Sequence, residues 1–139
     1  DRDPRERVIT VAYFALIPSD RLVIRAASDA DAVGWFGLRE LPPLAFDHAD
    51  IVAMAHARLS AKLDYSTIAF QFMPAEFPLS QLQQVYERIL GEALDKRNFR
   101  KRVLALQQIE PTGEQQREGA HRPANLYRII DRDKVDIIK

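Results

Sequence analysis

Cysteine is absent from the 139 residues of this chain. Its absence excludes disulfide bonds and thiolate metal sites, and it is typical of a cytoplasmic protein. No apolar run approaches the roughly 20 residues that a helix needs to span a membrane, and we expect no signal peptide. A glycine-rich phosphate loop and a Ser/His/Asp pattern are missing as well. We therefore expect a cytoplasmic protein that neither enters a membrane nor depends on disulfides.

An excess of charge of one sign is also missing, since 20 Lys and Arg balance 20 Asp and Glu. A net charge of zero does not indicate a nucleic-acid binder, but affinity for phosphate depends on local charge. Residues 1–74 carry 8 basic and 10 acidic side chains, a net charge of −2, and residues 75–139 carry 12 and 10, a net charge of +2. Because Pro74 and Pro78 mark a linker, we predict one domain over residues 1–74 and a second over residues 75–139.

The stretch from Leu79 to Leu106 has the pattern of two helices joined by a short turn. Ser80 and Gln83 have the spacing of a helix N-cap box. Apolar residues then recur at steps of three and four, at Leu79, Leu82, Val85, Tyr86, Ile89 and Leu90. Gly91 is suited to end this helix, and Asp95 is suited to cap the next. The pattern predicts a helix-turn-helix with helices over residues 79–90 and 95–106.

The second of these helices has an apolar face and a cationic face. With a step of about 100° per residue, Phe99, Val103 and Leu106 fall within one narrow sector, and Leu104 is the one apolar residue on the polar side. The polar residues are Lys96, Arg97, Asn98, Arg100, Lys101 and Arg102. Arginine offers forked donors to guanine edges and phosphates, and asparagine pairs with adenine. This pattern fits a helix in a major groove as well as a solvated basic face on an ordinary packed helix.

The residues that follow favour the first interpretation. Residues 107–112 predict a short strand in which Pro111 is tolerated near an end or on an edge. A polar loop and a returning strand over residues 126–130 complete a two-stranded ribbon between about residues 107 and 131. A helix-turn-helix followed by such a ribbon is a winged helix. Its wing carries Arg117 and Arg122, which are placed to reach a phosphate or a minor groove.

The first part of the chain predicts strands and one helix. Residues 8–17 form an almost unbroken apolar and β-branched run, which is typical of a strand buried on both faces. A loop and a strand are expected over residues 29–41, around the aromatic pair Trp35 and Phe36, and another strand over residues 67–73. Between them, Asp47 is expected to cap a helix. Its apolar side would be formed by Ile51, Ala55, Leu59 and Leu63.

Two blocks of sequence resemble the Nudix-related transcriptional regulators of NAD metabolism. Three motifs look like the C-terminal half of a Nudix domain: Arg2-Asp3-Pro4-Arg5-x-Arg7-Val8, Trp35-Phe36-x-Leu38 and Leu41-Pro42-x-Leu44-Ala45-Phe46-Asp47-His48-x-x-Ile51. Two more are similar to the winged helix fused to it in that family: Leu90-Gly91-x-x-Leu94-Asp95-Lys96-Arg97-Asn98-Phe99-Arg100-Lys101 and Arg122-Pro123-Ala124-x-Leu126-Tyr127. The implied fold class is α+β, a partial Nudix-like α/β half-domain followed by a winged helix-turn-helix.

The Nudix signature itself, Gly-x5-Glu-x7-Arg-Glu-U-x-Glu-Glu-x-Gly-U, has no match in the chain. Its glutamates hold Mg²⁺ against a diphosphate, and in the family it lies upstream of the position of Asp1. Residues 39–41 begin like its middle, but Pro43 and Leu44 stand where the paired glutamates belong. We therefore interpret the chain as a fragment or as a protein without its first half, with Mg²⁺ expected only together with that half. No metal-ligand spacing is formed by the three histidines, His48, His56 and His121.

The resemblance implies a transcriptional regulator, a repressor of NAD-biosynthesis genes, with ADP-ribose or a related nucleotide as its effector. It implies a homodimer on a palindromic double-stranded operator. The implied DNA contacts are Lys96, Arg97, Asn98, Arg100, Lys101 and Arg102 of the second helix and Arg122 of the wing. For the effector it implies Arg5 and Arg7 as diphosphate contacts, and the loop position of Trp35 leaves stacking on an adenine open.

Two alternatives stay open at this point. In the first alternative to the regulator, the chain is part of a Nudix hydrolase of ADP-ribose whose accessory winged helix serves dimerisation. In the second, the winged helix serves protein–protein contact alone. An intact upstream signature would favour hydrolysis, and a degraded one would favour sensing. From the residues present, we expect this chain to be no enzyme.

Overall fold

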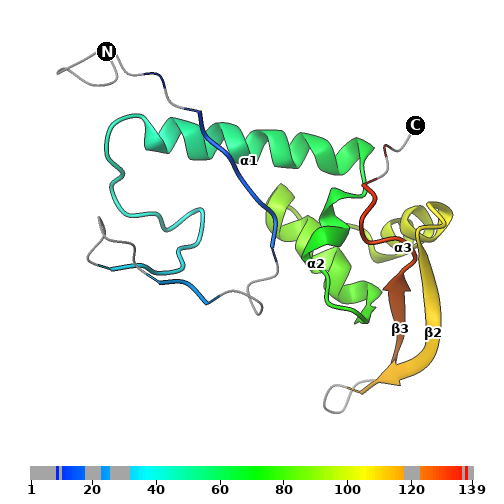
Figure 1. Ribbon diagram of the computed structural model, residues 1–139. Helices are drawn as coiled ribbons and strands as arrows, with labels where there is room; N and C mark the ends of the chain where they lie inside the picture. Colours follow the sequence, from blue (N-terminus) through cyan, green and yellow to red (C-terminus); the bar gives the residue numbers. More distant parts are fainter. Residues whose placement is uncertain are drawn as a thin grey trace. The chain divides into compact units, whose positions relative to one another are not determined.

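The computed structural model describes residues 9, 11–17, 23–25, 32–117, 123–135 and 137. Its helices and strands, in chain order, are α1 (His48–Tyr65), the 3₁₀ helix η2 (Ile68–Phe72), β1 (Phe77–Pro78), α2 (Leu79–Leu90), α3 (Lys96–Ala105), β2 (Ile109–Gln116) and β3 (Ala124–Ile129) (Figure 1). The chain divides into two compact units, Asp1–Ala57 and Arg58–Lys139. No helix in the described part is long and apolar enough to cross a membrane.

The first unit is irregular before α1 in its described residues. The strand predicted over residues 8–17 is wrong for Ile9 and residues 11–17, which form no strand, and Ile9 and Tyr13 are 87% and 91% exposed. A strand exists only where a neighbour takes its backbone hydrogen bonds, and no described strand pairs with this segment. The strand expected within residues 29–41 is likewise absent from residues 32–41, where the amide of Glu40 closes a turn on the carbonyl of Gly37 at 2.9 Å.

The helix expected after Asp47 is confirmed as α1, and the amide of Ile51 donates to the Asp47 carbonyl at 3.1 Å. Its expected apolar side is the less exposed one, with Leu63 fully buried in the second unit. The strand predicted over residues 67–73 is wrong, because η2 occupies this stretch. Its bonds from Phe70 to Thr67 (2.9 Å) and from Met73 to Phe70 (3.0 Å) span three residues. Since a short buried apolar run suits a strand or a helix, its pattern alone could not decide.

The helix-turn-helix is confirmed within one residue at each end. Gly91 ends α2 in the left-handed conformation (φ 79°), and its amide donates to the Glu87 carbonyl at 2.8 Å. Asp95 caps α3, since its carboxylate accepts from the Asn98 amide at 2.8 Å. The N-cap box predicted at Ser80 is wrong, because α2 already begins at Leu79 and Pro78 is the capping residue. Proline has no side-chain acceptor, so this helix starts without a side-chain cap.

The core of the second unit lies between the two helices of this motif and the elements around them. The Phe99 and Tyr86 rings meet edge to face, with centroids 5.2 Å apart. Burial raises the pKa of Tyr86 above its ordinary value, against the opposing effect of the positive Arg102. The largest fully buried side chains in the described part are Leu63, Met73, Phe77, Leu82 and Val103. Since two of these precede Pro74, the packing of this unit starts upstream of the predicted boundary, and the division into residues 1–74 and 75–139 stays a prediction.

A three-stranded antiparallel sheet in the order β1-β3-β2 confirms the expected ribbon. Figure 1 shows its strands β2 and β3 side by side. Tyr127 in the central strand pairs with Phe77 of β1 and Pro111 of β2. Pro111 therefore lies on an edge strand, as its missing N–H requires. The polar loop is shorter than expected, because β2 continues through Gly113 as far as Gln116. Residues 118–122 of this loop, including Arg122, lie outside the described residues.

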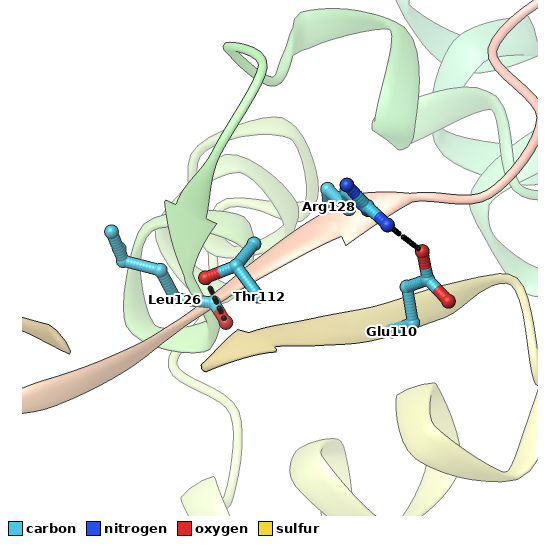
Figure 2. A network of polar contacts seen from close by, with 4 residues as sticks. All are labelled: Glu110, Thr112, Leu126 and Arg128. Carbon is cyan, nitrogen blue, oxygen red and sulfur yellow. Dashed lines mark hydrogen bonds and ion pairs between the residues drawn. The ribbon is translucent and has the colours of Figure 1, made fainter. Parts of the chain in front are cut away.

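The wing is bent where β2 holds three residues against one on β3, between the pairs Pro111–Tyr127 and Gln115–Asn125. Gly113 has φ +86°, which glycine adopts without strain. Figure 2 shows the Thr112 hydroxyl donating to the Leu126 carbonyl (3.3 Å) across the two strands. The same figure shows Arg128 paired with Glu110 on the opposite strand, at 2.6 Å from Nη2 to Oε1. Because both side chains are exposed, this pair contributes about 1 kcal/mol at most.

The residues after β3 return to the start of the unit. Arg132 Nη1 donates to the Met73 carbonyl at 3.1 Å, and its Nη2 donates to the Pro74 carbonyl. Gln71 Nε2 donates in turn to the Arg132 carbonyl at 3.0 Å. These bonds hold the segment between η2 and β1 against the residue that follows the sheet, so the two ends of the winged helix are fastened together.

Replacing Phe99 by Ala should lower the free energy of unfolding by about 3–5 kcal/mol, because the ring fills the space between α2 and α3. Urea denaturation of the chain measures this loss. Leu104→Ala is the matched control, since Leu104 lies on the same helix and is 38% exposed. Equal losses for the two variants would show that Phe99 is not a core residue.

Candidate nucleic-acid interface

The six residues of α3 predicted to contact DNA are all exposed. Phe99 and Val103 are buried, so the packing of this helix presents its cations to solvent. The six do not have equal surroundings, however. Arg100 and Arg102 are held by other elements, whereas no hydrogen bond or ion pair within the described part of the chain holds Arg97 or Lys101. These two, one helical turn apart, have all their donors available to a ligand.

Arg102 points to the end of α1. Its Nη2 donates to the Asp64 carbonyl at 2.8 Å and lies 3.5 Å from the Leu63 carbonyl. These oxygens belong to the last turn of α1, where carbonyls lack partners within the helix and the helix dipole favours a positive charge. Arg102 therefore fastens α3 to α1, a role that the sequence did not indicate. Its predicted contact with a phosphate stays a prediction.

The turn between α2 and α3 is braced by Gln83 and Glu87. Glu87 Oε1 accepts from the Leu94 amide and from Gln83 Nε2, each at 2.9 Å. Gln83 Nε2 also donates to the Leu94 carbonyl at 2.9 Å. The Leu94 amide, and to a smaller extent Gln83, lower the pKa of the Glu87 carboxyl, since both hydrogen bonds favour the charged form. This brace fixes the angle at which α3 leaves α2.

Arg100 is held by the wing. Its Nη2 donates to the Tyr127 hydroxyl at 3.2 Å. The ring of Tyr127 is 6% exposed in the middle of the sheet, so the hydroxyl is a fixed point. The pairing gives this arginine a preferred direction along α3 toward the base of the wing. No sequence signal pointed to Tyr127, because an apolar strand predicts the burial of a tyrosine ring and not the partner of its hydroxyl.

A polar groove lies at this junction, with a volume of about 490 Å³. It is bounded by the start of α2, the first turns of α3 and the two strands of the wing. Its lining residues are Pro78, Leu79, Ser80, Gln83, Lys96, Phe99, Arg100, Gln115, Pro123, Ala124, Asn125 and Tyr127. Among the described residues, the lining holds two cations and no carboxylate. Electrostatically it is therefore suited to an anion.

In the described part of the wing, one of the two arginines is paired with a carboxylate. Arg117 is exposed at the end of β2, while Arg128 is neutralised by Glu110. Further out, Gln115 Nε2 donates to Asn125 Oδ1 at 2.9 Å across the strands. The wing thus offers amides beside the cations of α3.

The predicted effector contacts stay a prediction, since only Trp35 among them is described. Arg5 and Arg7 lie outside the described residues, and Trp35 is 62% exposed in the first unit. A hollow of about 590 Å³ in that unit does not include Trp35. It is lined by Leu38, Leu41, Pro42, Pro43, Leu44, Ala49, Val52, Ala53 and His56. Among the described residues, no group of three or more His, Cys, Asp and Glu is placed to hold a metal ion.

A braced helix-turn-helix, a three-stranded sheet and an outward cationic helix together define a winged-helix domain of the DNA-binding class. Residues 69–129 match the family model of the NrtR DNA-binding winged helix domain. The resemblance to Nudix-related regulators found in the sequence is thereby confirmed.

Relatives and solved structures agree with this assignment. The chain is 38% identical over 134 residues to the ADPR responsive transcriptional repressor NtrR of Acinetobacter baylyi. The aligned residues make up 95% of this chain and 53% of that protein. The structure of Shewanella oneidensis NrtR is similar with a TM-score of 0.73 at 37% identity, over 92% of this chain and 58% of that one. NrtR of the same organism complexed with a 27mer DNA is similar with a TM-score of 0.57 at 38% identity, over 63% of this chain and 39% of that one.

A shorter match is to the ADP-ribose pyrophosphatase of Methanocaldococcus jannaschii, with 40% identity over 52 residues. These residues make up 37% of this chain and 30% of that enzyme. The chain spans about half the length of the curated repressor that it matches, 53%. The α+β fold class with a winged helix, predicted from the sequence, is confirmed by the family model and by the structure of the Shewanella oneidensis protein.

Glu87→Gln should change how stability depends on pH. Because the pKa of Glu87 is lowered from its ordinary value of 4.5, its stabilising effect is fully present above that value and is lost as the pH falls through the lowered pKa. The wild-type chain should therefore lose stability in this acid range that the variant does not lose. Urea denaturation at a series of pH values measures the difference, with Glu76→Gln as an exposed control. Parallel curves for wild type and Glu87→Gln would contradict the brace.

Proposed function

We propose that this chain is part of a DNA-binding repressor of NAD-metabolism genes that responds to ADP-ribose or a related nucleotide. The observation that carries the proposal is the cationic face of α3, turned outward by the burial of Phe99 and Val103 in an NrtR-type winged helix. A helix in this position lies in the major groove in other helix-turn-helix proteins. Its available side chains then meet base edges and phosphates.

The relatives supply the pathway and the effector. The Acinetobacter baylyi protein is described as an ADPR responsive transcriptional repressor, and the Shewanella oneidensis protein was solved with DNA. We propose both properties for the protein that contains this sequence. Arg5, Arg7 and Trp35 are proposed as effector contacts, and the exposed ring of Trp35 is accessible for stacking on an adenine.

The proposed mechanism is a shift between two populations of a homodimer. A palindromic operator requires two recognition helices at a fixed spacing. An effector that binds better to a dimer with another spacing lowers operator affinity by its difference in affinity for the two states. Repression is then relieved when the nucleotide accumulates.

The proposed DNA contacts divide into two groups. At least one of Arg97, Lys101 and the flanking Asn98 and Arg100 is proposed to reach a base edge, because no side chain in the described part of the chain holds Arg97 or Lys101. Phosphate contacts are proposed for Lys96, Arg102 and, in the wing, Arg122. In Arg102 this role would be added to its bond with α1.

A second candidate function is hydrolysis of ADP-ribose by the protein that contains this sequence, with the winged helix as an accessory domain. The observation in its favour is the partial match to an ADP-ribose pyrophosphatase. It conflicts with the repressor match, which covers 95% of this chain. We therefore rank it second.

Arg97→Ala and Lys101→Ala should separate DNA reading from nonspecific attraction. At least one of them should weaken binding to promoter DNA of an NAD-biosynthesis gene by about 1–3 kcal/mol, with a much smaller effect on scrambled DNA. Fluorescence anisotropy at two salt concentrations measures both affinities. Arg128→Gln is the matched control, since Arg128 is already paired with Glu110. Equal affinity of the wild type for promoter and scrambled DNA, unchanged by either variant, would contradict DNA reading. The winged helix would then serve dimerisation or protein–protein contact.

The 139-residue chain itself should not hydrolyse ADP-ribose, because it lacks the glutamates with which a Nudix helix holds Mg²⁺ on a diphosphate. Release of AMP from ADP-ribose in the presence of Mg²⁺ is the assay. A Nudix hydrolase with an intact signature provides the positive control. Turnover above the background without protein would overturn this expectation, whereas binding of the nucleotide without turnover would agree with it.

A further inference from the structure

We propose that the groove between α2, α3 and the wing is a binding site for one backbone phosphate of DNA, built around the Arg100–Tyr127 pair. The proposal rests on the DNA-binding function proposed above and assigns a ligand to a place within it. It also moves Arg100 from the side chains able to read bases to those that position the duplex. It also adds a DNA contact outside the recognition helix, namely Tyr127 of β3.

The hydrogen-bond capacity of the pair points to an oxyanion. The Tyr127 hydroxyl accepts from Arg100 Nη2 at 3.2 Å and keeps its own proton, for which the described residues provide no acceptor. A guanidinium has five N–H donors, so Arg100 can hold the tyrosine and still bind a second group. Both side chains therefore offer donors at the same place, and a phosphodiester offers acceptors only.

The rest of the lining agrees with this ligand. Lys96 adds a second cation one turn before Arg100, and the amide side chains of Gln115 and Asn125 form the wall on the wing side. The one carboxylate next to Lys96 in sequence, that of Asp95, is engaged with the Asn98 amide. A phosphate in the groove would thus meet two positive charges, and charge-assisted hydrogen bonds of this kind are about twice as strong as neutral ones.

The place of the groove favours a phosphate of DNA over a free anion. Its cations Lys96 and Arg100 lie on the same helix as Arg97 and Lys101, within about one turn of them. A strand whose bases face Arg97 and Lys101 must pass its backbone along the border of α3. On the wing side, that border is the groove.

The fixed partner gives this site a function in orientation. A surface arginine loses side-chain entropy when it binds, and part of that loss has already occurred in an arginine held by a buried tyrosine. The Tyr127 hydroxyl is therefore both a ligand and a positioning group for Arg100. Because a phosphate is present at every step of a duplex, the contact contributes to affinity for any sequence and sets the register of α3.

Tyr127→Phe tests the proposal, because it removes one hydroxyl and leaves the buried ring. With the 139-residue chain, we expect binding to promoter DNA and to scrambled DNA to weaken by the same factor, about three- to tenfold. The salt dependence should be unchanged, since no charge is lost. Arg100→Gln should weaken both duplexes and reduce the salt slope by about one. The combined variant should lose less than the product of the two factors.

Methylphosphonate substitution locates the contact. In a series of duplexes that each carry one uncharged phosphate, we expect one position at which the substitution lowers the affinity of the wild type. At that position it should not lower the affinity of Tyr127→Phe any further. Arg128→Gln, on the same strand but outside the groove, should behave like the wild type throughout. Thermal unfolding of each variant shows that the fold is intact, and Arg100→Gln, which changes an exposed side chain, decides the matter if Tyr127→Phe is destabilised.

Three outcomes would overturn the proposal. One is unchanged DNA affinity in both Tyr127→Phe and Arg100→Gln, and another is a loss confined to promoter DNA, which would make the pair a base reader. The third is a loss of the response to ADP-ribose with unchanged DNA affinity, which would make the groove a site for the nucleotide. If the wild type binds neither duplex, the proposed function itself fails, and that result is distinguishable from these three.

Discussion

The burial of the Phe99 and Val103 face of α3 is the constraint on which the second unit depends. Packing this face against Tyr86 and its neighbours fixes the rotation of the helix about its own axis. Since side chains advance by a fixed angle along a helix, that rotation determines which cations face solvent. The polar contacts then refine a helix whose orientation the apolar contacts have already set. Without the apolar contacts, the orientation of the helix that these polar contacts require would be lost.

Much of the second unit could be predicted from its sequence because its signals are local. Gly91 and Asp95 act within one turn of chain, and the apolar spacing of α2 needs no knowledge of distant residues. The errors lie where the partner is distant or where two structures share one pattern. The run from Ile9 to Ile17 suits a buried strand, but such a strand exists only beside another. Residues 68–72 are apolar and short, which suits a strand and a 3₁₀ turn equally well.

In the candidate site too, the features set by local sequence could be predicted, and those set by distant residues could not. The cationic face of α3 follows from helical geometry, and all six of its predicted residues are exposed. What the sequence could not show is that they differ. Arg100 meets a tyrosine 27 positions away, and Arg102 meets the Asp64 carbonyl 38 positions away. Pairings of this separation depend on the tertiary fold, whereas residue type alone gives all three arginines of the helix the same description.

Several contacts that hold the unit together join a side chain to backbone oxygen atoms. Arg102 reaches the Asp64 carbonyl, Arg132 reaches the carbonyls of Met73 and Pro74, and Gln83 reaches that of Leu94. Every amino acid supplies the same carbonyl, so these bonds require no particular side chain at the accepting position, whereas they do require one at the donor. Such contacts leave no pair of positions that change together during evolution. Coupled substitutions in related sequences would therefore miss the ties that fix the recognition helix, and single invariant arginines and glutamines would be their only trace.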